Sequence, residues 1–218
     1  MGKTAIVLGA TGLTGGVLVQ RLLADPLFDR IKLFSRRSMK LRHPKIEEQR
    51  IDVLQLARYA EEFTGDVVFC CIGTTKAKTP DKQLYKKIDY GIPVTASQLA
   101  VENEIKTFIV ISAMGANANS STFYNCTKGE MEDFVLQQKI ENIHILQPSL
   151  IGGKRQEKRF GESIAKFFMG FFEFVIPKKY KIITPETIAT AMHWLALHEY
   201  HEQKITSDKI KEIASYES

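Results

Sequence analysis

Three residues in the middle of the chain have the types and spacing of a proton-transfer site. Tyr124 and Lys128 lie four residues apart in a predicted helix, so both side chains project from one face. Ser112 comes directly after an apolar run that is typical of a strand. A phenol, an ammonium and a hydroxyl can therefore face one crevice. An exposed amphipathic pair is the ordinary alternative for a tyrosine and a lysine at this spacing.

The chemistry expected of these residues is proton transfer by Tyr124. A free tyrosine has a pKa of about 10, so roughly a thousandth of it is phenolate at neutral pH. An ammonium about 4–5 Å away, at an effective dielectric constant near 20, stabilises the phenolate by about 3–4 kcal/mol. The sequence therefore predicts that Lys128 lowers the pKa of Tyr124 toward neutrality, where proton exchange is efficient.

A glycine-rich turn near the amino terminus is typical of dinucleotide binding. Residues 9–15 have the order Gly-Ala-Thr-Gly-Leu-Thr-Gly, follow an apolar run and lead into a helical pattern. The first glycine permits a tight turn, the second lets backbone N–H groups approach a pyrophosphate, and the third lets the helix lie close to the strand. We expect cofactor contacts from Gly9, Thr11, Gly12, Leu13, Thr14 and Gly15.

The residues after the second apolar run indicate which dinucleotide is bound. NAD-binding proteins of this type commonly place a carboxylate here, whereas this chain has Arg36 and Arg37. Guanidinium groups bind a 2′-phosphate through charge-assisted hydrogen bonds, so we expect NADP, with NADPH preferred over NADH. Because Lys40 and other basic residues follow, a solvated basic loop is the alternative. Asp52 and Val53, which end the third run, are expected to flank the adenine.

Apolar runs and helical patterns alternate through the first 150 residues, which indicates an α/β fold. The runs are nearly continuous, as expected of parallel strands that are covered on both faces. Right-handed crossovers favour a doubly wound parallel sheet of order 3-2-1-4-5-6, with its ligand crevice near strands one and four. Strands are predicted at Ala5–Leu8, Ile31–Phe34, Gln49–Val53, Val67–Cys71, Thr107–Ile111 and Ile143–Leu146. Helices are predicted at Leu13–Leu23, Leu54–Glu62, Asp81–Ala100 and Thr122–Ile140.

A further stretch falls at the edge of that crevice. Gly73, Thr74 and Thr75 follow the fourth predicted strand. Their backbone N–H groups and hydroxyls are expected to contact the ribose and phosphates of the cofactor. A plain strand-to-loop turn is the alternative.

The strand–helix alternation stops after Ile151, and the remainder is too short for a second full domain. We therefore expect one domain over residues 1–218, with 151–184 as a small C-terminal lid over the substrate. Two closing helices are predicted, one after Pro185 and one capped by Ser207.

The late segment 154–181 combines basic charge with phenylalanine. It holds eight lysines and arginines against three glutamates, which accounts for the whole net charge of +5. Residues 167–174 hold five of the 13 phenylalanines. Packing over an apolar substrate, contact with a protein partner or a second copy through 160–180, and attachment to a membrane surface are all compatible with this composition. Because the excess charge belongs to one segment, nucleic-acid binding is not expected.

Length and composition indicate an ordinary globular protein. The chain has 218 residues, 44% hydrophobic and 25% charged, which excludes disordered and fibrous classes. Its longest apolar run, 167–176, is interrupted by Glu173 and is shorter than the roughly 20 residues of a membrane span. No cleavable leader is recognised after Met1, and the three cysteines lack CxxC spacing, so we expect inert thiols and a cytoplasmic location.

Histidines near the C-terminus raise the question of a metal site. His198 and His201 flank Glu199 and Tyr200, which is one residue short of the HExxH spacing of zinc proteases. We therefore expect no metal.

Taken in order, these motifs resemble the atypical short-chain dehydrogenase/reductases, and most closely the subgroup around the Tat-interacting NADP-binding oxidoreductase-like proteins. The resemblance spans most of residues 1–150 and is carried by the glycine run, Arg36-Arg37, Phe69–Thr75, Ser112, Tyr124 with Lys128, and Pro148. It implies a Rossmann-type fold in which the tyrosine is the acid or base and the lysine holds the nicotinamide ribose. It further implies that the serine polarises the substrate carbonyl and that Pro148 touches the nicotinamide amide. Asp89 is a departure, because many members carry a proton-relaying asparagine in this neighbourhood.

The resemblance favours an NADP(H)-dependent oxidoreductase that reduces a carbonyl or related small organic substrate. Two alternatives stay open. One is a non-catalytic NADPH-binding regulator, in which cofactor occupancy changes binding to a protein partner. The other is a flavin or quinone reductase that uses the same nucleotide fold without an obligatory tyrosine.

Overall fold

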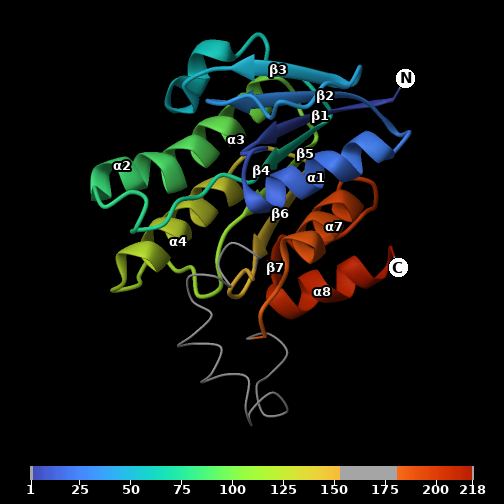
Figure 1. Ribbon diagram of the computed structural model, residues 1–218. Helices are drawn as coiled ribbons and strands as arrows, with labels where there is room; N and C mark the ends of the chain where they lie inside the picture. The colour runs from blue at the N-terminus through green and yellow to red at the C-terminus, as the bar shows by residue number, and fades with distance from the viewer. Residues whose placement is uncertain (1, 153–180, 218) are drawn as a thin grey trace.

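The computed structural model describes residues 2–152 and 181–217, and the strands in this part of the chain form one parallel sheet (Figure 1). The strand order is β3-β2-β1-β4-β5-β6-β7, so the predicted order of the first six strands is confirmed. The strands are β1 (Lys3–Leu8), β2 (Phe28–Ser35), β3 (Ile46–Arg50), β4 (Val67–Cys70), β5 (Thr107–Ile111), β6 (Asn142–Gln147) and β7 (Lys204–Thr206). Because all neighbouring strands are parallel, the loops that follow them share one edge of the sheet.

Helices cover both faces of this sheet (Figure 1). On one face α1 (Leu13–Ala24) packs against α7 (Pro185–Leu195), and α7 packs against α8 (Ser207–Ser215). The other face is covered by the 3₁₀ helix η1 (Val53–Tyr59), α2 (Lys82–Lys86), the π-helical turn η2 (Lys87–Gly91), α3 (Ile92–Glu102) and α4 (Phe123–Leu136).

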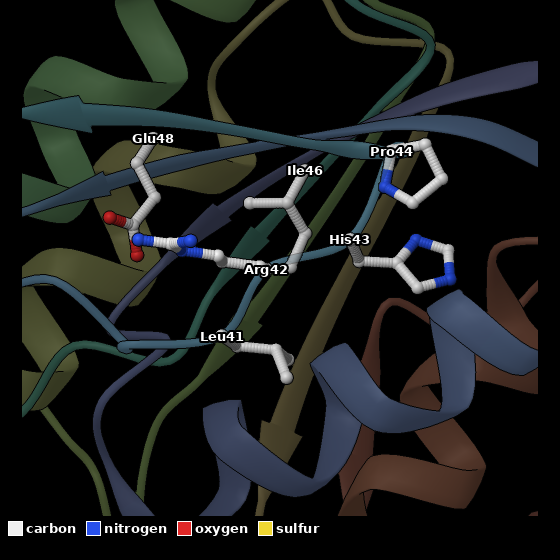
Figure 2. A pocket seen from close by; sticks show the side chains of 6 residues that line it. All are labelled: Leu41, Arg42, His43, Pro44, Ile46 and Glu48. Atoms are coloured by element: carbon white, nitrogen blue, oxygen red, sulfur yellow. The ribbon is translucent and has the colours of Figure 1, made fainter.

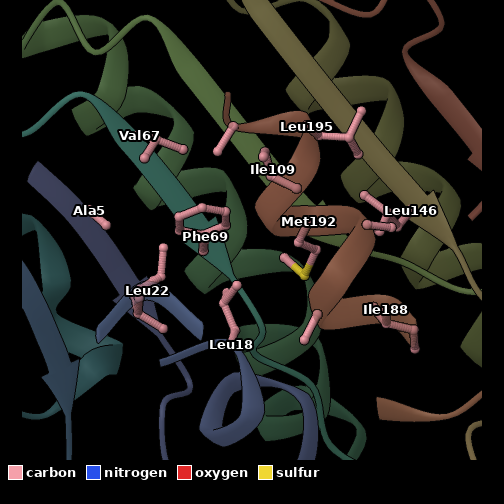
Figure 3. Close-up of a cluster of buried hydrophobic side chains, with 14 of the residues drawn as sticks. Ala5, Leu18, Leu22, Val67, Phe69, Ile109, Leu146, Ile188, Met192 and Leu195 are labelled. Atoms are coloured by element: carbon pink, nitrogen blue, oxygen red, sulfur yellow. The ribbon is translucent and has the colours of Figure 1, made fainter. Parts of the chain in front are cut away.

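The core consists of two buried clusters, one on each face of the sheet. On β1, Ala5 and Val7 belong to the cluster beneath α1, while Ile6 and Leu8 belong to the opposite cluster. Successive strand residues point to opposite faces, so burial of both faces gives the continuous apolar runs in the sequence. Figure 3 shows the first cluster, in which Met192 of α7 lies among side chains of α1 and the central strands.

The predicted boundaries around the third strand are wrong. β3 runs over Ile46–Arg50 instead of Gln49–Val53, and the following helix is η1, a 3₁₀ helix over Val53–Tyr59 rather than an α-helix at Leu54–Glu62. Asp52 explains the difference, because its side chain accepts a hydrogen bond from the Leu54 N–H (3.1 Å) and so begins η1.

The long helix predicted at Asp81–Ala100 is present but is not a regular α-helix. The Asp81 carboxylate accepts hydrogen bonds from the first turn of α2, as an N-cap does. The chain then passes through η2 into α3, which ends at Glu102. Asp89 lies within η2, and single π-helical turns of this kind occur frequently at functional sites.

The C-terminal part adds a strand that the sequence analysis did not predict. β7 pairs with β6. It has only three residues, which is too short to give a strand pattern in the sequence. α7 begins after Thr184, whose hydroxyl accepts from the Thr187 N–H, in agreement with the helix expected after Pro185. The expected cap of the last helix is wrong: Thr206 is the N-cap of α8, and Ser207 is its first residue.

The predicted lid is described only at its two ends. Ile151 and Ile183 form an isolated parallel bridge, and the Gly152 N–H donates to the Ile183 carbonyl oxygen (2.9 Å). Residues 153–180, which include the phenylalanine-rich stretch, lie outside the described residues.

Candidate functional site

The glycine turn after β1 has the close backbone contacts that its sequence predicts. Gly9 has φ +85°, in the left-handed region that favours glycine. A Cβ on Gly9 would lie 2.7 Å from the carbonyl oxygen of Cys71, and a Cβ on Gly15 would overlap the carbonyl oxygen of Gly9. The Gly12 N–H donates to the Gly9 carbonyl oxygen (2.9 Å) and closes the turn. The strand, the turn and α1 can approach this closely because both positions lack a Cβ.

The amino-terminal end of α1 is open to an anion. Its N-cap residue, Gly12, supplies no side-chain hydrogen bond, and the first turn of this completely described helix contains no acidic residue. Thr11, Gly12 and Leu13 are exposed, whereas Thr14 is buried. Unpaired N–H groups and the positive end of a helix dipole bind phosphate well, so this turn fits the diphosphate of a dinucleotide.

The two arginines predicted to bind a 2′-phosphate lie just beyond β2. Arg36 and Arg37 are both exposed, and the hydroxyl of buried Ser35 donates to the Arg37 carbonyl oxygen (2.8 Å), which fixes their backbone. Asp52 is also exposed, but Val53 is 5% exposed and packs in the core.

A hollow lies at the loop that joins β2 to β3 (Figure 2). The Met39 N–H donates to Glu48 Oε1 (2.7 Å) and ties this loop to β3. The hollow is lined by Leu41, Arg42, His43, Pro44, Ile46 and Glu48. None of the predicted site residues lines it, so it is separate from the candidate site.

α4 carries both Tyr124 and Lys128, as the spacing predicts. Tyr124 is 43% exposed at the start of the helix, whereas Lys128, one turn further on, is 3% exposed. Lys128 Nζ lies 3.0 Å from Asp89 Oδ1 of η2 and donates to the Ile111 carbonyl oxygen at 3.4 Å. The structure therefore combines an accessible phenol with a buried ion pair.

The loop after β4 is fixed to this ion pair through Thr74. The Thr74 N–H donates to Asp89 Oδ2 (2.8 Å), and the Thr74 carbonyl oxygen accepts from the Tyr85 hydroxyl (3.2 Å). The hydroxyls of Thr74 and Thr79 share a hydrogen bond of 2.8 Å. Asp89 thus joins the loop at the predicted crevice to the lysine of α4.

Gly73 lies against the same pair. A Cβ at this position would be 3.6 Å from Asp89 Oδ1 and 4.0 Å from Lys128 Nζ. Gly73 and Thr75 are exposed, so the chain beside the ammonium is accessible to a ligand.

The electrostatics of Tyr124 differ from the expectation. Burial raises the pKa of Tyr124, the charge of Lys128 lowers it, and the charge of Asp89 raises it again, so that the pKa lies above the ordinary value. The predicted lowering is wrong because burial of the phenol outweighs the charge of Lys128, and because Asp89, which pairs with Lys128, opposes that charge as well. Tyr124 is therefore protonated at neutral pH.

Ser112 is buried after β5 and faces a carboxylate of α4. Its hydroxyl donates to Glu132 Oε1 at 2.5 Å. The fully buried Glu132 also accepts two hydrogen bonds of 2.9 Å from Gln147 and lies 3.1 Å from Lys204 Nζ. Within the described residues no hydrogen bond joins Ser112 to Tyr124. The structure thus brings Tyr124 and Lys128 together as predicted, while Ser112 has a different partner.

The loops around the site are held by close backbone contacts. The Met114 N–H donates to the carbonyl oxygen of buried Pro148 (3.0 Å), which joins the loops after β5 and β6. A Cβ on Gly129 would overlap the backbone of Asn117 and Ala118, so glycine lets this loop rest on α4 directly after Lys128.

Sequence reasoning missed Gly129 and Glu132, and it noticed Asp89 only as a departure from a family pattern. Glu132 lies one helical turn after Lys128, so its spacing was available in the sequence. No local pattern distinguishes a buried glutamate from a solvated one.

The cysteines and histidines carry no sign of a further centre. Cys70, Cys71 and Cys126 are free, and burial raises the pKa of Cys70 to about 11. His198 stacks on Trp194 with ring centroids 4.4 Å apart. Over residues 2–152 and 181–217, no group of three or more histidine, cysteine or acidic side chains is arranged to hold a metal ion. The same residues include no helix long and apolar enough to cross a membrane.

Comparison with protein families identifies the chain. Residues 9–150, more than half of the sequence, match the family model described as NAD(P)H-binding. The chain belongs to this NAD(P)H-binding family. Among its relatives, Protein HTATIP2 of Rattus norvegicus is 33% identical over 172 residues, which cover 77% of this chain and 71% of that protein. Protein FMP52, mitochondrial, of Candida albicans is 32% identical over 169 residues, 75% of this chain and 74% of that protein. These matches confirm the predicted resemblance to the atypical short-chain dehydrogenase/reductases.

Solved structures of other proteins share the fold of this NAD(P)H-binding protein. MoeE5 in complex with UDP-glucose and NAD has a TM-score of 0.68 and 13% identity, with 99% of this chain and 82% of that chain covered. The Bordetella bronchiseptica enzyme WbmG in complex with NAD has a TM-score of 0.69 and 13% identity, with 99% and 77% covered. At this level of identity the likeness concerns the fold alone.

Proposed function

We propose that this NAD(P)H-binding protein is an NADP(H)-dependent oxidoreductase that reduces a carbonyl or related small organic compound. The observation that carries the proposal is the half-exposed Tyr124 one turn from buried Lys128. Both lie at the sheet edge where Gly9, Gly73 and Ser112 follow their strands. Ligands of doubly wound sheets bind at this edge, at the point where the strand order reverses.

The chain's own residues suit the successive parts of the cofactor. The glycine turn and the first turn of α1 suit the diphosphate, Arg36 and Arg37 suit a 2′-phosphate, and exposed Asp52 suits the adenosine end. Gly73–Thr75, in the loop after β4, and the loop at Pro148 suit the opposite end of the cofactor. Gly73 lies near Lys128. When bound, the nicotinamide supplies a hydride to the substrate.

Within this proposal Tyr124 protonates the substrate oxygen, and Lys128 holds the ribose end of the cofactor beside it. The single proton of the Ser112 hydroxyl is donated to Glu132. Polarisation of a substrate carbonyl by Ser112 therefore requires that its side chain rotate away from Glu132.

A non-catalytic NADPH-binding regulator is the second candidate, since such a protein does not need Tyr124 to be activated as a base. Asp89 neutralises Lys128, and the pKa of Tyr124 is raised, so the phenol is not activated as a base. In this case cofactor occupancy would act on a protein partner or on a second copy of the chain, through residues 160–180.

The test is NADPH oxidation with a panel of aldehydes, ketones and quinones, comparing wild type with Tyr124→Phe. A general acid contributes about 10²–10⁴-fold to the rate, so we expect Tyr124→Phe to bind NADPH normally and to lose at least about 100-fold in kcat. Tyr59→Phe, in η1, is the matched control and should keep the wild-type rate.

The other outcomes separate the alternatives. Tight NADPH binding without turnover of any compound would favour the regulator. Quinone reduction that is unchanged in Tyr124→Phe would remove this phenol from the mechanism and favour the quinone-reductase reading.

We also propose a cytoplasmic location. FMP52 of Candida albicans is named as a mitochondrial protein, which gives the specific alternative. Fractionation of cells that express the protein at its natural level distinguishes the two compartments.

A further inference from the structure

A buried ion pair stands next to the accessible phenol of Tyr124. Asp89 is 1% exposed and Lys128 is 3% exposed, and Oδ1 of the first lies 3.0 Å from Nζ of the second. A buried charge is costly unless an opposite charge accompanies it, and here each buried group has an oppositely charged partner. The pair therefore presents little net charge to Tyr124.

The titratable groups that face this pair come from three elements. Cys70 of β4, Tyr85 of α2 and Tyr124 of α4 all interact electrostatically with Asp89. Burial raises the pKa of Cys70 to about 11 and also raises the pKa of Tyr85. Both groups are neutral near pH 7. Burial has the largest influence on the Tyr124 pKa, and the charges that act on the phenol in addition are the two members of the ion pair.

Asp89 is held in this position from a second side. Its Oδ2 accepts the Thr74 N–H at 2.8 Å, and the Thr74 carbonyl oxygen accepts from the Tyr85 hydroxyl. Asp89 cannot leave Lys128 without also breaking the contact that fixes the loop after β4. The charge of the Lys128 ammonium is therefore opposed by a buried, hydrogen-bonded carboxylate and not by a surface charge.

We propose that Asp89 is a positioning residue that keeps Tyr124 protonated, so that the site donates a proton and works in the direction of carbonyl reduction. The inference rests on the proposed oxidoreductase function and adds the direction of the reaction. An unopposed Lys128 would favour the phenolate, which is the form that alcohol oxidation needs as a base.

The proton balance of the reductive step follows from this assignment. A bound reduced nicotinamide would supply the hydride to the carbonyl carbon and would itself be oxidised. The O–H bond of Tyr124 would break, and a new O–H bond would form on the substrate oxygen, which would then hold the carbonyl π electrons. The electron pair of the broken bond stays on the Tyr124 oxygen, and this half-exposed phenolate takes a proton from water before the next turnover.

The direct test is a cofactor-free titration of Tyr124 by NMR, in protein labelled with ¹³C at tyrosine Cζ and assigned with Tyr124→Phe. In wild type we expect a midpoint at or above the value of about 10 for free tyrosine. In Asp89→Asn the midpoint should move to lower pH, because the Lys128 charge is no longer opposed. The control Glu130→Gln removes a carboxylate of α4 that pairs with Lys86 at 2.6 Å, and it should leave the midpoint unchanged.

Two results would overturn the inference. One is a wild-type midpoint below that of free tyrosine, which decides the matter even if Asp89→Asn does not fold. The other is an Asp89→Asn midpoint equal to or higher than that of wild type.

Kinetics with a turned-over substrate then separate this inference from the proposed function. Wild type should reduce the carbonyl at a level rate between about pH 6 and 9, while oxidation of the alcohol rises with pH, and Asp89→Asn should move that rise to lower pH. If turnover depends on Tyr124 but the titration fails, the oxidoreductase proposal stands and the role of Asp89 falls. If the titration succeeds and nothing is turned over, Asp89 still controls the phenol and the oxidoreductase proposal falls.

Discussion

We expect Arg36 to determine cofactor choice in the proposed site, and one substitution tests this. Arg36→Ala removes charge-assisted hydrogen bonds worth about 1.5–3 kcal/mol, so NADPH should bind roughly 10- to 100-fold more weakly. NADH, which lacks the 2′-phosphate, should change by no more than about twofold on the same grounds. Isothermal titration of both cofactors gives the two ratios.

A second basic residue in the same stretch provides the control for Arg36. Arg42 is also exposed, in the loop before β3, and Arg42→Ala removes the same charge at a greater distance along the chain. Equal weakening of NADPH and NADH in Arg36→Ala would contradict the phosphate assignment. If the two alanine variants weakened NADPH binding equally, the effect of Arg36 would be a general electrostatic attraction and not a specific contact with the 2′-phosphate.

Local spacing explains which site residues the sequence could predict. Tyr124 and Lys128 are one helical turn apart, and Gly9 and Gly15 flank a strand-to-helix turn, so short-range geometry places each pair. The partner of Lys128 is different, because Asp89 lies on another helix and no spacing links the two. Burial of the phenol and the charge of Asp89 both raise the Tyr124 pKa, and neither can be read from local spacing, so the prediction from Lys128 alone was wrong.

The turn into α1 permits a matched pair of glycine substitutions at the scale of one element. In Gly15→Ala the new methyl overlaps the Gly9 carbonyl oxygen, whereas in Gly16→Ala it would lie 3.4 Å from the Ala10 carbonyl oxygen, an ordinary contact. We expect Gly15→Ala to lose about 1–3 kcal/mol of unfolding free energy, as overpacking does, and to weaken NADPH binding. Gly16→Ala should be neutral or stabilising by up to about 1 kcal/mol, since alanine favours the helix.

Denaturant unfolding and cofactor titration of the two variants measure both effects. A Gly15→Ala protein with wild-type stability and affinity would show that α1 can move away from β1 without cost. The close approach of helix and strand would then not be the reason for glycine at this position.

Elements were predictable where they are long and buried, and not where a single contact decides them. The strands β1, β2, β4, β5 and β6 are continuous apolar runs because both faces of the sheet are covered. Most residues of β3 (Ile46–Arg50) are polar, and the side chain of Asp52 begins the next helix soon after it. The strand was therefore predicted several residues too late in the sequence. The π-helical turn η2 has only five residues, which is too short for a periodicity argument to separate it from the helices around it.

At the scale of the whole molecule, the two ends of the chain build one core. α7 packs on α1, and Met192 of α7 lies 4.0 Å from the sulfur of Cys71 at the end of β4. His193 lies 2.7 Å from Asp25 Oδ2 and 2.6 Å from Glu217 Oε1, so it joins the end of α1 to the last described residues. The family match ends at residue 150, yet the buried cluster beneath α1 also contains residues of α7 and α8, which come later in the chain. Contacts across such separations leave no trace in local sequence patterns.

His144 makes the stability of the whole domain sensitive to acid. It is buried in β6, its Nδ1 lies 3.4 Å from the Glu202 carbonyl oxygen, and its ring meets Tyr200 edge to face at 6.2 Å. Burial lowers the pKa of His144 below that of an unfolded histidine, about 6.5, so the unfolded chain binds the proton at higher pH than the folded protein does. Stability from this group is complete above the unfolded pKa and is lost as the pH falls toward the folded pKa.

The measurement is the unfolding free energy from denaturant titrations between about pH 7.5 and 5, a range that spans the unfolded histidine pKa. His144→Gln should be less stable than wild type near neutrality, because a buried ring is lost, but its stability should fall less steeply with acid. His201→Gln, at an exposed histidine, should keep the wild-type slope. If His144→Gln and wild type lose stability in parallel over this range, the folded domain tolerates a charged His144, and the acid sensitivity must come from other groups.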